Sequence, residues 1–128
     1  MADDARRLRE RQARGKRARR DGRRAEFIAL WLLRLKGYRL VARNLRTPVG
    51  EIDLLMRRGG VVAVVEVKRR AGSSAADAIS AAQRGRLLRA SQWALAARPQ
   101  LAQLQIRFDV VLLESGRWPR HVQDAWRA

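Results

Sequence analysis

Two apolar runs that meet at a double glycine dominate the pattern of hydrophobic and polar positions. Residues 50–57 contain Glu-Ile-Asp-Leu-Leu-Met, residues 61–69 contain Val-Val-Ala-Val-Val-Glu-Val-Lys, and Gly59 and Gly60 lie between them. Short apolar runs separated by glycines predict a β-hairpin with strands over about these two ranges. Each strand carries ionised side chains among its apolar residues, and charged groups are seldom buried without a partner or a purpose.

Helical spacing precedes this hairpin, and a further strand lies between them. Apolar residues recur at i, i+3, i+4, i+7 and i+10 and predict a helix with Asp21 as its N-cap and Gly37 at its end. The stripe consists of Ala25, Ile28, Ala29, Leu32 and Leu35. Residues 38–42 read as a short strand, and residues 44–48 read as a turn.

After the hairpin, residues 71–74 form a small-residue link, and the alanine-rich stretch 77–97 predicts a second helix that ends before Pro99. Strands are expected over 105–113 and 118–122, and a last turn of helix over 124–126. The order α-β-β-β-α-β-β fits an α/β fold in which helices flank one mixed sheet of about five strands.

The ends of the chain differ in character. Residues 1–20 are a run of arginines with few apolar side chains, which cannot bury enough surface to offset the entropy of ordering. We therefore expect a mobile basic tail over 1–20, helical when bound to a partner, and a single domain over 21–128. A solvated helical extension without a role is the alternative for the tail.

Charge narrows the choice of partner. The 128 residues include 29 Lys and Arg against 12 Asp and Glu, a net charge of +17. Such an excess favours a polyanion, and nucleic acid is the first candidate, ahead of an anionic membrane surface. No apolar run approaches the roughly 20 residues that cross a bilayer, and no secretory signal is visible at the start, so we expect a cytoplasmic protein.

The chain has no cysteine and one histidine, His121. Disulfides, thiolate zinc sites, cysteine nucleophiles and multi-histidine metal sites are thereby excluded. A metal site would have to be built from carboxylate, carbonyl and water oxygens, which suit Mg²⁺ or Mn²⁺.

The hairpin offers such a site. Because successive strand residues face opposite sides, Glu66 and Lys68 point the same way, and Asp53 on the paired strand is close enough to join them. Asp53 and Glu66 could hold Mg²⁺, with the Val67 carbonyl as a third oxygen, while Lys68 holds the attacking water or counters developing charge. The alternative is a structural ion pair between a carboxylate and Lys68, although buried pairs seldom add net stability.

Three runs in this order also carry a family resemblance. The runs are Gly50-Glu51-Ile52-Asp53-Leu54, Glu66-Val67-Lys68-Arg69-Arg70 and Arg107-Phe108-Asp109-Val110-Val111. They resemble the YraN-type family of uncharacterised bacterial proteins, over about residues 22–126. That family in turn resembles the restriction-endonuclease-like superfamily, which includes the archaeal Holliday-junction resolvases.

The resemblance implies a restriction-endonuclease-like fold with Asp53 and the Glu66–Lys68 pair as motif residues. It implies that Glu26 on the first helix completes the metal site, and that a homodimer is plausible because resolvases of this fold act as dimers. Gln83 stands where many relatives have lysine, and related nucleases use glutamine there to position the site. An exposed helix glutamate is the alternative for Glu26.

Other side chains are less specific. Arg69 and Arg70 directly follow the proposed site and could hold a phosphate, as could Arg84, Arg86 and Arg89 on the second helix, which could equally be solvated. Stacking on bases is possible for the tryptophans, although core packing is their commoner use. The tryptophans are Trp31, Trp93, Trp118 and Trp126. Asp109 is expected to be structural, and His121 to be a surface or strand-end residue.

The sequence therefore favours a nucleic-acid-binding protein with Mg²⁺- or Mn²⁺-dependent endonuclease chemistry, DNA being the favoured substrate. In this hypothesis Asp53 and Glu66 bind metal, Lys68 orients the water and Glu26 assists. Two alternatives stay open: a binding module for DNA or RNA without catalysis, and an assembly protein that binds its partner through the tail.

Overall fold

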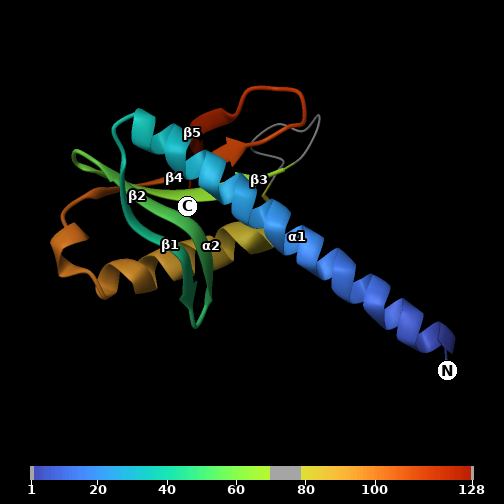
Figure 1. Ribbon diagram of the computed structural model, residues 1–128. Coiled ribbons are helices and arrows are strands. Elements are labelled where there is room, and N and C mark those ends of the chain that lie inside the picture. Colours follow the sequence, from blue (N-terminus) through green and yellow to red (C-terminus); the bar gives the residue numbers. More distant parts are fainter. Residues whose placement is uncertain (1, 70–78, 128) are drawn as a thin grey trace.

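Five strands form one mixed sheet with a helix on each face (Figure 1). The computed structural model describes residues 2–69 and 79–127, and for residues 16–21 it describes the backbone alone. The elements are α1 (Ala2–Leu35), β1 (Arg39–Thr47), β2 (Gly50–Arg58), β3 (Val61–Lys68), α2 (Ala81–Ala96), the 3-10 helix η1 (Pro99–Leu101), β4 (Gln105–Leu112) and β5 (Arg120–Trp126). This architecture confirms the predicted α/β class and sheet.

Strand order in space follows strand order in sequence, from β1 at one edge to β5 at the other. All neighbouring pairs are antiparallel except β3 and β4, which run parallel. A parallel pair needs a crossover connection, and α2 lies within it. The turn between β2 and β3 is tight, and Gly59 adopts a φ of +56° there, which glycine tolerates without steric cost.

Alternation along the strands divides the core into two layers. Val62, Val64 and Val110 pack beneath α2, whereas Ala63 and Val65 pack beneath α1. The sheet is therefore covered on both faces, which explains why β3 reads as an almost continuous apolar run. Charged side chains on β3 occur only at its carboxyl end, where Glu66 and Lys68 follow the valines.

Helix α1 buries only part of the stripe that periodicity predicted, and Leu33 in addition. Ala25, Ala29 and Leu33 are buried, but Ile28 is 39% exposed and Leu35 is 83% exposed. Residues 27–35 are apolar on every side of the helix except at Arg34, so spacing alone could not decide which side meets the sheet. The predicted end is confirmed, since Gly37 has a φ of +91° directly after the last turn.

The prediction that this helix begins at Asp21 was wrong, because α1 runs without a break from Ala2. Alanine and arginine are strong helix formers, and lack of apolar surface argues against burial rather than against a helix. The first half of α1 projects beyond the sheet (Figure 1). Whether residues 1–20 are mobile in solution, and whether 21–128 is one independent domain, stay predictions. Among the described residues, no helix is long and apolar enough to span a membrane.

Three further boundaries differ from the sequence prediction. Strand β1 continues to Thr47 through the stretch predicted as a turn, with Asn44 at a φ of +50°. Strand β5 replaces the predicted final turn of helix, because its last residue, Trp126, pairs with Phe108 of β4 and stacks on its ring at 4.0 Å. Helix α2 starts at Ala81 behind the N-cap Ser80. The predicted link over 71–74 and the helix start at residue 77 lie outside the described residues.

Candidate active site

Asp53 lies where the two strands of the hairpin separate. The β2–β3 ladder runs from Arg58 and Val61 to Leu54 and Val65 and ends there. One residue further along β2, Oδ2 of Asp53 accepts a hydrogen bond from the Val67 amide at 2.9 Å. The carboxylate thus takes the place that a strand carbonyl would occupy and is held against the end of β3.

Glu66 and Lys68 lie on the face of β3 that α2 covers. Glu66 is only 7% exposed, and its Oε1 lies 3.4 Å from Nζ of Lys68. The same oxygen accepts a hydrogen bond from Nε2 of Gln83 at 2.9 Å. Gln83 reaches it because it lies on one helical stripe with Leu87, Ala90 and Ala94, the buried face of α2.

These side chains border a pocket of about 250 Å³. Its lining residues are Gly50, Glu51, Asp53, Glu66, Gln83, Arg86 and Leu87. Gly50 allows β2 to approach α2 closely, since a Cβ atom there would lie 3.2 Å from the carbonyl oxygen of Arg86. The start of β2 and the first turns of α2 therefore form the two walls, and the carboxylates lie between them.

The two carboxyl groups perturb each other. Burial raises the pKa of Glu66 to about 7, and the charge of Asp53 adds to this effect while Lys68 opposes it. Burial also raises the pKa of Asp53, and hydrogen bonds from the Val67 amide and from Glu66 work in the other direction. Without a cation, the pair is most stable when the Glu66 carboxyl group is protonated and donates a hydrogen bond to the Asp53 carboxylate.

Glu26 adds a third carboxylate to the rim. It lies on α1 in line with Leu30 and Leu33, so its side chain turns toward the sheet. Burial raises the pKa of Glu26, a hydrogen bond from Asn44 lowers it, and the charges of Asp53 and Glu51 raise it. The structure thus brings Glu26 within the electrostatic reach of Asp53, and its part in a metal site stays a prediction.

The donor set suits a hard divalent cation that keeps most of its water. Asp53 and Glu66 would hold the cation, while the Val67 amide and Gln83 fix the orientation of their carboxylates. Among the described residues, no group of three or more acidic or histidine side chains could hold a metal ion by itself. Mg²⁺ is bound in this way, by one or two carboxylates with water and phosphate oxygens, and a cation would stabilise the charged form of both buried carboxylates.

Removing divalent cations should make the stability of the protein fall as pH rises from about 5 to about 8. Folded Glu66 has a pKa of about 7 against 4.5 for the ordinary group, so the native state binds the proton more tightly than the unfolded state. The free energy of unfolding therefore decreases above the unfolded pKa, by at most about 3 kcal/mol once pH exceeds the folded value. Urea unfolding in EDTA at both pH values measures this slope.

The matched variant for this measurement is Glu66→Gln, which cannot ionise. Its stability should change less with pH than that of the wild type, and should exceed the wild-type value at the higher pH. An equal slope in both proteins would show that Glu66 is not the titrating group.

The predicted phosphate-binding arginines lie in different surroundings. Arg86 is exposed and lines the pocket with the carboxylates. Arg84 is half-buried, with its guanidinium 5.9 Å from the centre of the Trp126 ring, so packing is part of its role. Arg69 is exposed and lines a second pocket, beside α1. Arg70 lies outside the described residues.

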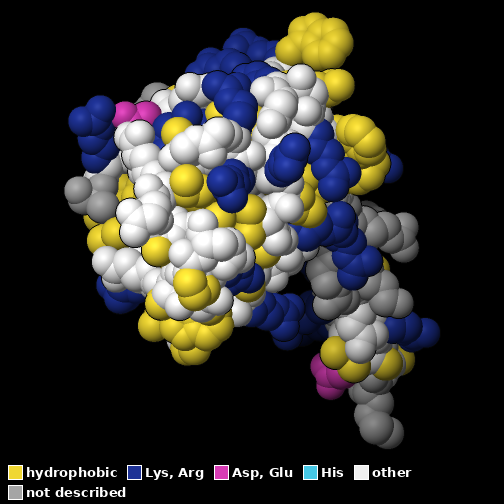
Figure 2. Space-filling model, turned by 90° about the vertical axis from the view of Figure 1, so that its left-hand side faces the viewer, with side chains coloured by type: hydrophobic (Ala, Val, Ile, Leu, Met, Phe, Trp, Pro, Cys, Tyr) yellow, Lys and Arg dark blue, Asp and Glu magenta, His cyan; other side chains and the backbone are white. Residues whose placement is uncertain are grey.

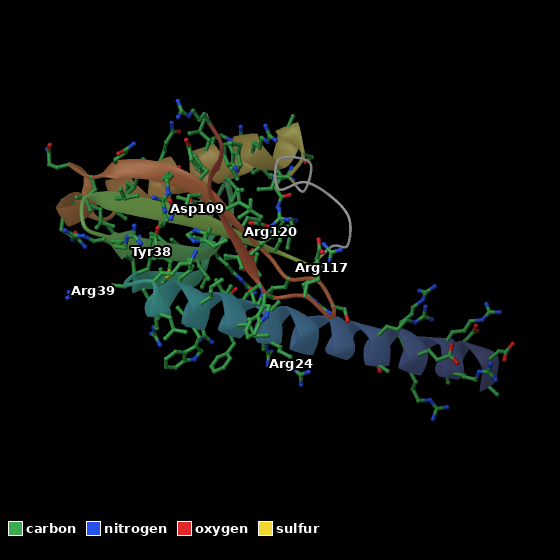
Figure 3. The ribbon with its side chains drawn as sticks, turned by 90° about the horizontal axis from the view of Figure 1, so that it is seen from above. Arg24, Tyr38, Arg39, Asp109, Arg117 and Arg120 are labelled. Atoms are coloured by element: carbon green, nitrogen blue, oxygen red, sulfur yellow. The ribbon has the colours of Figure 1, made fainter. Side chains whose placement is uncertain are left out.

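A buried ion cluster on the other face of the sheet escaped sequence reasoning. Asp109 is fully buried, and its carboxylate accepts hydrogen bonds from Arg107 at 2.7 and 2.8 Å and from His121 at 2.8 Å. Arg107 also donates to the Tyr38 hydroxyl, and the Asp124 amide donates to Asp109 at 3.0 Å. Tyr38 and Asp109 lie close together in Figure 3.

His121 is the second residue of β5, which confirms the strand end as one of the two expected positions. Its imidazole is fully buried and does not lie on the surface. Nε2 faces Asp109, and Nδ1 lies 3.1 Å from Nζ of Lys36. Burial pushes the pKa of Asp109 up, but the hydrogen bonds from His121, Arg107 and the Asp124 amide outweigh it and hold the pKa below its usual value. Asp109 is therefore a charged anchor between β4 and β5.

Comparison with known proteins places the chain among bacterial relatives of matching length. The model of an uncharacterised protein family, UPF0102, matches residues 25–113. A UPF0102 protein of Parvibaculum lavamentivorans is 58% identical over 107 residues, which cover 83% of this chain and 80% of the relative. A UPF0102 protein of Caulobacter vibrioides is 52% identical over 118 residues, covering 91% and 94%. The chain therefore belongs to the uncharacterised protein family UPF0102.

Proposed function

We propose that this protein is a Mg²⁺- or Mn²⁺-dependent endonuclease that hydrolyses phosphodiester bonds in DNA. The observation that carries the proposal is that Asp53 and Glu66 line one pocket with Arg86 on its wall, while Nζ of Lys68 lies 3.4 Å from Glu66. Two acidic groups whose pKa values are raised by burial, beside a cationic side chain, are typical of a functional site rather than of a stabilising ion pair.

The residues would divide the work as follows. Asp53 and Glu66 would hold the metal ion, which when bound supplies activation of water and neutralises charge on the phosphate. Lys68 lies against Glu66, where its ammonium can orient the attacking water and stabilise negative charge that develops on the phosphate. Gln83 fixes the orientation of the Glu66 carboxylate through their hydrogen bond, and Glu26 adds negative charge at the rim.

Fold resemblance supports the same reading. The runs that contain Asp53, Glu66 and Asp109 resemble the restriction-endonuclease-like superfamily, and the order α-β-β-β-α-β places the first two on adjacent strands. A fold alone does not establish an activity, so the proposal depends on the site residues.

The charge of the chain supports nucleic acid as the substrate. With a net charge of +17, the protein is expected to bind phosphate backbones with an affinity that falls steeply with salt. Figure 2 shows Lys and Arg side chains distributed over the face that it presents, with few Asp or Glu among them. DNA in place of RNA, a cytoplasmic location and a homodimer stay predictions.

The full chain, incubated with Mg²⁺ or Mn²⁺ and a panel of branched, flapped, single-stranded and duplex DNAs, should cut at least one substrate. Cutting should stop in EDTA and return when the metal is restored, because the bound cation would activate water and neutralise charge on the phosphate. Products are resolved on denaturing gels with each strand labelled in turn. If no DNA is cut in either metal, while all are bound, the endonuclease proposal is wrong.

One observation favours a second candidate function. Asp53 already accepts a hydrogen bond from the Val67 amide, and Glu66 already has Gln83 and Lys68 as partners. A protein that retains the fold and charge but binds nucleic acid without cutting it would need no more than this. In that case, binding would be unchanged by Asp53→Asn and by the presence of metal.

A further inference from the structure

We propose that the groove between α1 and the β4–β5 connection binds an unpaired stretch of nucleic acid, with Trp118 stacking on a base. The inference rests on nucleic acid being the ligand of the proposed function, and it specifies substrates that contain a single-stranded segment. It does not require that the protein cut the strand.

The groove is a pocket of about 690 Å³ built from three parts of the chain. Helix α1 contributes Arg24, Ala25 and Ile28, and Arg69 follows the end of β3. The β4–β5 connection supplies the opposite wall with Leu113, Glu114, Ser115, Arg117, Trp118 and Pro119. Figure 3 shows Arg117 on this connection and Arg24 on the stretch of α1 that the connection approaches.

Trp118 is set apart from the other tryptophans by its exposure. It is 91% exposed, whereas Trp31 and Trp93 are 46% and 43% exposed and Trp126 is 6% exposed. Leaving an indole this exposed is unfavourable in free energy, because burial would stabilise its large apolar surface. Pro119 follows it directly and restricts the backbone, so the ring is presented on a short, constrained segment.

Charge around the groove is positive. Arg24 and Arg69 are exposed, and Arg117 has 75% of its side chain exposed. One glutamate, Glu114, lies 3.5 Å from Arg117, which leaves the walls with an excess of cations. Arginines that flank an exposed aromatic ring are the combination by which proteins bind single strands, since cations track the phosphates while bases stack.

The groove and the carboxylates lie at the same end of the sheet. Arg69 follows Lys68, and the carbonyl of Lys68 accepts a hydrogen bond from the Leu113 amide at 2.8 Å. Residues 24–28 of α1 likewise serve both sites, since Arg24 lines the groove while Glu26 faces Asn44 and Asp53. The groove therefore lies at the same end of the sheet as the carboxylates, on the face that α1 covers.

The composition of the groove favours nucleic acid over an anionic membrane or an acidic protein. Three guanidinium groups and one aromatic ring line the groove together with the apolar side chains of Ala25, Ile28, Leu113 and Pro119. Membrane-binding surfaces are apolar over a broad face, whereas cations are interleaved with the apolar side chains here. A hollow of this shape fits a flat base with its adjoining phosphates. Binding to vesicles and binding to DNA can be compared directly, which makes the membrane an outcome of the test.

Trp118→Ala should weaken binding of a short labelled single-stranded DNA by about tenfold and binding of a blunt duplex of the same sequence by less than about twofold. Fluorescence anisotropy of the full chain in EDTA measures both affinities, so that no strand is cut. Trp118→Phe should recover part of the loss, because a phenyl ring stacks less well but still stacks.

Trp93→Ala is the matched control, since Trp93 lies on α2 away from the groove and is also partly exposed. It should bind the single strand as the wild type does. Thermal unfolding of Trp118→Ala should match the wild type, because a side chain this exposed contributes little to folding. Equal affinities of Trp118→Ala and wild type for the single strand would overturn the inference. The inference would also be overturned if Trp118→Ala weakened duplex binding by the same factor, or weakened only binding to vesicles of anionic lipid.

The two proposals can fail separately. If Trp118→Ala weakens single-strand binding but the wild type cuts no DNA, the binding groove is supported and the endonuclease proposal is wrong. If the protein cuts DNA but binds single strands equally with and without the Trp118 indole, the endonuclease proposal is supported and the binding groove is wrong.

Discussion

Glu66→Gln is expected to lower the rate of DNA cleavage by at least about a hundredfold while leaving DNA affinity in EDTA within about twofold of the wild type. Glutamine has nearly the same shape and can still accept the hydrogen bond from Gln83, so the walls of the pocket stay in place. What is lost is the negative charge that would hold the cation beside Asp53. Single-turnover cleavage and anisotropy on the same substrate measure the two effects.

Glu10→Gln provides a control of equal charge change. Glu10 lies on the projecting part of α1, half-exposed and paired with Arg6 at 3.2 Å, far from the pocket in sequence and in the fold. Its cleavage rate should equal that of the wild type. If Glu66→Gln cut DNA at the wild-type rate, Glu66 would not be a metal ligand. Equal losses of cleavage rate in both variants would show that the effect comes from net charge and not from a specific site.

Asp109→Asn is expected to lower the free energy of unfolding by about 3–5 kcal/mol, because it removes the buried charge that Arg107 and His121 face. An asparagine amide can accept some of the hydrogen bonds but leaves the guanidinium without a counter-charge. For a chain of this size, the melting temperature should fall by roughly 10–20 °C. Urea unfolding followed by circular dichroism gives the free energy directly.

Asp124→Asn is the appropriate comparison for that variant. Asp124 also lies at the end of the network, but only its amide contacts Asp109, while its carboxylate forms an exposed pair with Arg127 at 3.0 Å. Surface pairs of this kind contribute less than about 1 kcal/mol, and asparagine tolerates the φ of +51° found at this position. If Asp109→Asn proved as stable as Asp124→Asn, the ion cluster would not anchor β5.

The hairpin and its charged residues could be predicted because the information is local. Alternation places Glu66 and Lys68 on one face, and the short turn at Gly59 brings β2 beside β3, so Asp53 had to lie near them. The position of Gln83 could be inferred only from resemblance, since the stripe that directs it toward Glu66 becomes clear once Leu87 and Ala90 are known to be buried.

The rest depended on contacts between residues far apart in the chain. Tyr38 and Arg107 are 69 residues apart, and Lys36 and His121 are 85 apart, so no spacing rule connects them. The sole histidine was interpreted from its position near a strand end, where burial depends on what packs above it. Likewise, α1 is apolar around much of its circumference near the sheet, and the choice of Leu33 over Leu35 for burial is made by tertiary packing.

The contiguity of β1, β2 and β3 has a consequence for how the chain acquires its structure. These strands occupy residues 39–68 without interruption, whereas the parallel partner of β3 begins only at Gln105. Local contacts form sooner than those that close long loops, so we expect the meander to assemble before β4 docks. Asp53 and Glu66 then meet before Gln83 can donate its hydrogen bond to Glu66, so we expect this contact to form late in folding.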